Sequence, residues 1–200
     1  MCVSQMSFDE TRFRRLALLS LIFKSAGSVV GRTKLQKIAY LANLCGWRAL
    51  DFKYHNYGPY SQALFAEMEN LQTIGWIKEE AFGTTRDGDV LYKYSFAPEQ
   101  KARRDNLIAK FADLRPENQK LVRNTNELVE GLAVKNSEEL EIMATLIYLR
   151  QENPSLTDDQ LIDLALPLKP YYNRRQFKDG MIVFRMMKHY MPESVQARHR

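Results

Sequence analysis

The chain has 200 residues, of which 45% are hydrophobic, and a formal net charge of +5; these values favour a soluble folded protein of one or two domains over a fibre or a disordered chain. The two most apolar runs, residues 16–23 and 38–45, are too short to span a bilayer, and the N-terminal residues lack the pattern of a signal peptide. We therefore expect a cytoplasmic protein with no membrane partner.

The positive charge is concentrated near the C-terminal end. Residues 1–97 carry 12 basic and 9 acidic side chains, residues 98–168 carry 9 and 13, and residues 169–200 carry 8 and 2. The net charges of the three segments are therefore +3, −4 and +6. This distribution fits an acidic partner, of which nucleic acid is the commonest, although a basic tail also serves solubility alone.

Helical spacing of apolar side chains predicts two helices in the first 46 residues. The first covers residues 8–26, and the stretch AGSVVGR at 26–32 ends it. The second begins at Arg32 or Thr33 and ends at Gly46, because glycine commonly follows the last turn of a helix.

An aromatic segment, FKYHNYGPYS at residues 52–61, precedes the third predicted helix. We expect a short extended stretch, then Pro59 at the first position of a helix that ends near Ile74. Two β-prone runs, 76–82 and 90–97, surround the turn-rich GTTRDGD and predict a β-hairpin. Three helices followed by a hairpin is the order of elements in a winged helix-turn-helix.

The rest of the chain has helical patterns throughout, and Thr157 and the acids that follow it are typical of a helix start. We predict a mainly α protein in which a winged-helix domain, residues 1–97, precedes a C-terminal helical subdomain, residues 98–200. The predicted C-terminal helices cover 99–113, 116–134, 137–151, 157–168 and 173–190.

Motifs that carry chemistry are missing from the sequence. There is no glycine-rich phosphate loop and no G-x-S-x-G nucleophile elbow. The three histidines have no metal-ligand spacing with each other or with the two cysteines. His55 is flanked by tyrosines without a neighbouring acid or nucleophile, so we expect a protein that is not an enzyme and has no cofactor.

Two segments carry a family resemblance. GRTKLQKIAYLANLCG followed by FKYHNYGPYSQAL, within residues 30–75, resembles the bacterial YwgA-like proteins, which are related more loosely to the SocA-type antitoxin family, also called Panacea. LIDLALPLKPYYNRRQFKDGM, within 140–185, is similar to the same group. The resemblance implies a non-enzymatic prokaryotic module of toxin–antitoxin, phage or defence settings, whose members neutralise toxins, serve as proteolytic adaptors or bind DNA.

Cations at two places are candidates for contacts with duplex DNA. Cations and amide donors at a helix N-terminus suit a phosphate group, and the start of the second helix offers Arg32, Lys34 and Lys37. Near the C-terminal end the candidates are Arg174, Arg175 and Lys178.

The third helix argues for a protein partner instead, because its expected exposed side chains include no cation and a major-groove reader needs donors there. This expected set is Ser61, Gln62, Glu67, Glu69, Asn70 and Gln72. Tyrosine gives a partner contact area at low entropic cost. The candidate partner-binding residues are Tyr54, His55, Tyr57, Tyr60 and Ser61. We expect DNA binding first; the alternative is a partner protein, such as a toxin, the client of a proteolytic adaptor or a second copy of the chain.

Overall fold

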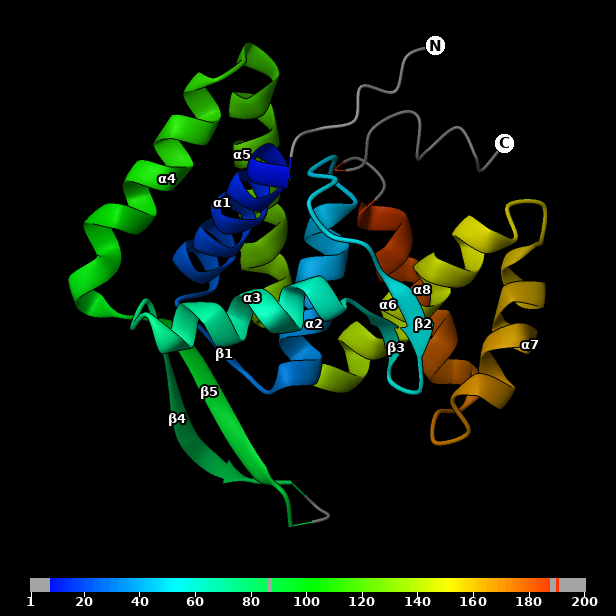
Figure 1. Cartoon of the computed structure of the whole chain (residues 1–200). Helices are drawn as coiled ribbons and strands as arrows, with labels where there is room; N and C mark the ends of the chain where they lie inside the picture. Colours follow the sequence, from blue (N-terminus) through cyan, green and yellow to red (C-terminus); the bar gives the residue numbers. More distant parts are fainter. Residues whose placement is uncertain (1–7, 86–87, 188–189, 191–200) are drawn as a thin grey trace.

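The computed structural model describes residues 8–85, 88–187 and 190, and it is mainly helical with two small antiparallel sheets (Figure 1). The helices are α1 (Phe8–Ala26), α2 (Arg32–Asn43), α3 (Gln62–Thr73), α4 (Lys101–Asp113), α5 (Pro116–Ala133), α6 (Ser137–Glu152), α7 (Asp158–Leu168) and α8 (Arg174–Met187), with a 3₁₀ turn, η1 (Pro98–Gln100), before α4. The strands are β1 (Ser28–Val30), β2 (Lys53–His55), β3 (Gly58–Tyr60), β4 (Ile77–Thr84) and β5 (Val90–Phe96).

The strands form two antiparallel sheets. In the larger sheet the order is β1-β5-β4, so β5 pairs with both neighbours, and Figure 1 shows the β4–β5 hairpin extending from the body of the protein. The smaller sheet is the β2–β3 hairpin. The predicted hairpin at 76–82 and 90–97 is confirmed by β4 and β5.

Two local predictions are wrong around the smaller sheet and before α2. Residues 28–30 form β1, which pairs with the distant β5, where we expected only a break between helices. Pro59 does not begin a helix: it lies in β3 opposite Tyr54. Ser61 caps α3, and its Oγ accepts a hydrogen bond from the Leu64 N–H at 3.2 Å.

One hydrophobic core extends through both halves of the sequence, from α1 to α8. Figure 1 shows α1 beside α4 and α5, and α2 between this group and α6. Trp47, which follows α2, is fully buried; its ring stacks on Phe111 of α4 with centroids 4.4 Å apart, and its Nε1 donates to Thr125 of α5 at 2.8 Å. The predicted boundary at 97/98 therefore falls between β5 and η1 within one core.

A buried carboxylate joins α3 to α1. Glu67, only 3% exposed, accepts hydrogen bonds from Arg12 at 3.2 Å and from Arg15 at 3.5 Å. The prediction that Glu67 and Ser61 lie on the exposed face of this helix is wrong, because both are buried. In the described ranges, no helix is long and apolar enough to cross a membrane.

Candidate binding site around the start of helix α2

The site lies where the first turns of α2 meet α3, the β2–β3 hairpin and the larger sheet. Gly31 precedes α2 with a φ of 91°, and no side chain caps the helix there. Gln36 fixes α3 against α2: its amide group donates to the Ser61 carbonyl at 3.1 Å and accepts from the Ser61 N–H at 2.9 Å. Two neighbouring cavities are lined by these first turns.

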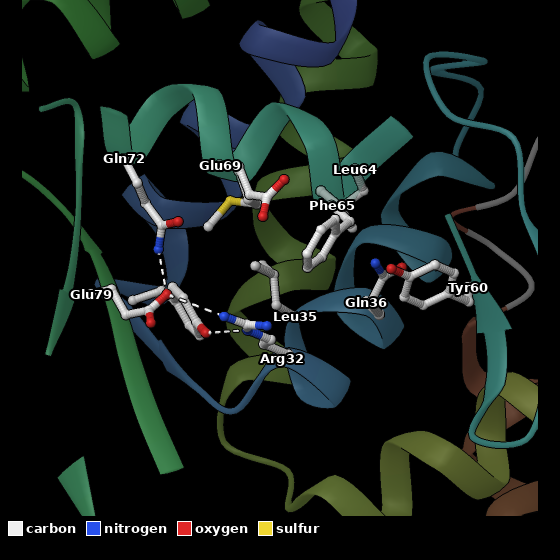
Figure 2. A pocket seen from close by; sticks show the side chains of 11 residues that line it. Arg32, Leu35, Gln36, Tyr60, Leu64, Phe65, Glu69, Gln72 and Glu79 are labelled. Carbon is white, nitrogen blue, oxygen red and sulfur yellow. Dashed lines mark hydrogen bonds and ion pairs between the residues drawn. The ribbon is translucent and has the colours of Figure 1, made fainter. Parts of the chain in front are cut away.

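The first cavity, which we name the α3 groove, has a volume of about 270 Å³ and lies between α2, α3 and the sheet (Figure 2). Apolar side chains of both helices make up much of its lining, and carboxylates lie at the end nearest the sheet. Its lining consists of Arg32, Leu35, Gln36, Tyr60, Leu64, Phe65, Met68, Glu69, Gln72, Glu79 and Tyr94.

Arg32 is the cation of the α3 groove. Its Nε donates to the Tyr94 hydroxyl at 2.9 Å, and its guanidinium lies 3.8 Å from a Glu79 oxygen and 5.6 Å from the centre of the Phe65 ring. The hydrogen bond with Tyr94 raises the pKa of Arg32 above its ordinary value, and the carboxylates of Glu79 and Glu69 act in the same direction. The side chain is still 61% exposed, so it can also contact a ligand.

The second cavity, which we name the hairpin pocket, has a volume of about 360 Å³. Polar and aromatic side chains of α2 and the β2–β3 hairpin line it, and none of them is acidic. Its lining consists of Arg32, Thr33, Gln36, Lys37, His55, Tyr57, Tyr60 and Gln62.

Lys37 is buried beneath this hairpin, with 1% of its surface exposed. Its Nζ donates to the Pro59 carbonyl at 2.9 Å, and no carboxylate of the described residues forms an ion pair with it. Burial lowers the pKa of Lys37 to about 8, and the nearby Lys169 acts in the same direction while Glu141 opposes it. The prediction that Lys37 is a surface contact for DNA phosphate is therefore wrong, because the hairpin covers it.

A second buried lysine, Lys169, forms an ion pair with Glu141, the carboxylate whose charge acts on Lys37. Lys169, 3% exposed, donates to Glu141 of α6 and to the carbonyl of Asn56 in the hairpin turn. The Tyr172 hydroxyl donates to the other Glu141 oxygen at 3.2 Å. Two buried amines thus share one carboxylate, and Lys169 is the one in contact with it.

The other predicted cations are in different surroundings. Lys34 is half-buried, and its Nζ donates at 2.7 Å to the carbonyl of Ala133, the last residue of α5. Arg174 forms ion pairs with Asp159 and Asp163 of α7. Arg175 and Lys178 are exposed on α8. The structure therefore separates the α8 cations from those of α2 and leaves few of the six available to a phosphate backbone.

The predicted aromatic residues are divided between core and surface. Tyr54 is half-buried with its ring 5.2 Å from that of Tyr148, whereas Tyr57 is 66% exposed. His55 is exposed, and its ring lies 5.7 Å from the half-buried Tyr60. Ser61 is fully buried and caps α3, so the prediction that it contacts a partner is wrong.

Sequence reasoning missed the apolar half of the site. Leu35, Leu64, Phe65 and Met68 line the α3 groove, but their helical spacing is also that of ordinary core residues. Cys45 is a buried core residue whose pKa rises to about 12 through burial, Met181 is in the core, and Arg86 of the hairpin turn lies outside the described residues.

Comparison with known proteins identifies one uncharacterised relative. The chain is 29% identical over 133 residues to the protein YwgA of Bacillus subtilis (strain 168), which is described as uncharacterised. The alignment covers 66% of this chain and 72% of YwgA. No family model matches the chain. The resemblance to YwgA-like proteins thus has support along two thirds of the sequence.

Proposed function

We propose that this protein is a non-enzymatic, winged-helix-type module whose α3 groove binds a short apolar segment of a partner polypeptide. The winged-helix part of the proposal is supported by the element order α1-β1-α2-α3-β4-β5 and by the strand order β1-β5-β4. Under this proposal α3 corresponds to the recognition helix and the β4–β5 hairpin to the wing. The β2–β3 hairpin is then an insertion between the second and third helices.

The observation that carries the protein-binding role is the chemistry of α3. Its exposed residues include Glu69 but no lysine or arginine, and an exposed carboxylate repels a phosphate backbone. The side of α3 that borders the groove instead offers Leu64, Phe65 and Met68. Apolar clefts with a few polar groups at the edge are typical of sites for peptides and small ligands.

Charge in the α3 groove selects among possible segments. Glu69 and Glu79 contribute two carboxylates, and Arg32 contributes one guanidinium that already contacts Tyr94 and Glu79. The groove therefore favours an apolar segment that carries a lysine or arginine, since a basic side chain can pair with Glu69, the carboxylate that Arg32 does not contact. The resemblance to antitoxin and adaptor proteins makes a prokaryotic toxin, or the client of a protease adaptor, the expected owner of such a segment.

Selection of random displayed peptides on the immobilised protein tests this role. We expect the selected peptides to combine apolar side chains with a basic residue, and Phe65→Asp to weaken their binding at least about tenfold, equivalent to about 1.4 kcal/mol. Ala66→Ser is the matched control, because Ala66 is exposed on α3 next to Phe65 but does not line the groove. Peptides whose binding is unaffected by Phe65→Asp would refute the α3 groove as the site.

Duplex DNA is the second candidate, and exposed cations favour it. Arg32 at the start of α2 and Arg175 and Lys178 on α8 are exposed, and contacts of this kind give binding that weakens steeply with salt. An electrophoretic shift assay with mixed-sequence duplexes across a salt series separates the two candidates. Salt-sensitive binding that Arg175→Ala and Lys178→Ala both weaken would favour DNA as the partner.

A further inference from the structure

The hairpin pocket differs from the α3 groove in the surroundings of its buried cation, Lys37. Around Lys37, hydrogen-bond donors outnumber acceptors. Its amine has three N–H donors and one described acceptor, the Pro59 carbonyl. Buried charges in proteins are normally paired, yet Glu141, the carboxylate whose charge acts on Lys37, is in contact with Lys169.

Two buried hydroxyl groups of this region, those of Tyr54 and Thr145, have few partners. Burial raises the pKa of Tyr54 and its interaction with the Thr145 hydroxyl opposes this, and among the described residues neither oxygen has a further hydrogen-bond partner. Thr145 is fully buried on α6. A buried polar group without a partner costs stability unless a water molecule or a ligand satisfies it.

Gly58 leaves the space between these groups open. A Cβ atom on Gly58 would lie 3.4 Å from Thr145 Oγ1, 3.5 Å from Lys37 Cε and 3.7 Å from Lys37 Nζ. These are ordinary van der Waals distances, so Thr145 and the end of the Lys37 side chain leave room for about one Cβ atom at this point. Of these residues, Lys37 also lines the hairpin pocket, together with His55 and Thr33.

We propose that the hairpin pocket binds the oxyanion group of a small molecule, a phosphate or a carboxylate, next to Lys37. The anion supplies the acceptors that this part of the interior lacks, and it neutralises the amine that has no ion pair. The lining of the pocket includes no acid that would repel it. The low pKa of Lys37 agrees with a buried amine that has no bound anion, because a bound anion favours the charged form.

Thermal unfolding of the full-length protein with added inorganic phosphate or sodium acetate tests the proposal, with sodium chloride at matched ionic strength as the reference. We expect a saturable rise in Tm with one of the two oxyanions, since a ligand that binds only the folded state stabilises it. Phosphate and acetate are separate arms because they distinguish the two ligand chemistries. No saturable rise with either anion would overturn the proposal.

Variants test whether the anion binds next to Lys37. Lys37→Met is expected to weaken the anion's apparent affinity at least about tenfold, whereas Lys34→Met, one turn earlier on α2 and in contact with Ala133, keeps the wild-type response. Lys37→Gln removes the charge but keeps a donor for the Pro59 carbonyl, and we expect a similar loss of affinity; it serves as the second test if Lys37→Met does not fold. An undiminished response in both variants would show that the anion binds elsewhere and refute the site.

Discussion

The α3 groove and the hairpin pocket are neighbours at the first turns of α2, and they share Arg32, Gln36 and Tyr60. In the groove the cation is matched: Arg32 contacts a hydroxyl, a carboxylate and an aromatic ring while it remains largely exposed. In the pocket the cation Lys37 is buried and has a single carbonyl partner. The two cations thus differ in how many partners each has, and we expect this difference, more than the number of cations in the segment, to decide where a ligand binds.

The largest expected effect on stability is at Glu67, which holds α3 against α1. Glu67→Ala removes the carboxylate that holds Arg12 and Arg15, and we expect about 2–3 kcal/mol less stability, because the loss of one partner leaves the others uncompensated. Urea unfolding measures this change. Glu69→Ala on the exposed side of α3 is the control, with an expected effect within about 0.5 kcal/mol. Equal effects of the two substitutions would contradict the anchoring role of Glu67.

The second effect concerns the unpaired charge in the hairpin pocket. Lys37→Met is expected to raise stability at pH 7 by about 2 kcal/mol, because it removes the cost of burying a charge. The loss of the hydrogen bond to the Pro59 carbonyl offsets part of this gain. Urea unfolding of both proteins at pH 7 measures this difference. A variant that is less stable than the wild type would show that Lys37 is well satisfied without a ligand.

The same pair of proteins gives a pH test. The pKa of Lys37 is lowered to about 8 in the folded state, so the unfolded chain binds more protons between pH 8 and the ordinary lysine range, and wild-type stability rises with pH there. The advantage of Lys37→Met is therefore present below pH 8 and shrinks as the pH approaches 10. Glu141 and Lys169 face Lys37 in both proteins, and Cys45 titrates in both, so the difference isolates Lys37. A constant difference from pH 7 to 10 would contradict the lowered pKa.

A smaller effect is expected from a Cβ atom on Gly58, which would lie beside Lys37 under the hairpin. Gly58 has a φ of 82°, and Gly58→Ala places a Cβ near Lys37 and Thr145, so we expect a loss of about 1–2 kcal/mol. The same change should abolish the Tm response to oxyanions and leave peptide binding in the α3 groove intact. Gly75→Ala is the matched control, because Gly75 also has a positive φ but open space around it. Undiminished anion binding in Gly58→Ala would contradict the site.

The smallest effect on stability is expected at the residue that both cavities share. Arg32→Met should change the free energy of unfolding by no more than about 1 kcal/mol, because the side chain is 61% exposed and its ion pair with Glu79 is long. Peptide binding in the α3 groove should change more than stability does, which fluorescence anisotropy measures with a labelled peptide. A loss of several kcal/mol would mean that Arg32 is mainly structural.

The sequence predicted best those features that depend on near neighbours. Thr157 caps α7 as expected, with its side chain accepting from the Gln160 N–H, because a capping pattern is contained within four residues. β1 was missed because its partner, β5, lies more than sixty residues away. Pro59 was assigned to a helix because proline at a first helical position and proline in an edge strand have the same local signature.

The candidate site shows the same division. The sequence located the first turns of α2 and the aromatic segment, which do meet in space. It could not show that the β2–β3 hairpin covers Lys37, that Lys34 reaches the end of α5, or that Arg174 pairs with α7. Burial and pairing of these cations depend on how distant elements pack, and charge patterns along a chain contain no information on that packing.

The stacking of Trp47 on Phe111, with its hydrogen bond to Thr125, has a practical consequence for work with shortened chains. A fragment that stops at residue 97 would leave the indole and the apolar sides of α1 and α2 facing water, so it should aggregate on expression. Because both halves supply the surroundings of this indole, its fluorescence should report a single melting transition for the intact protein.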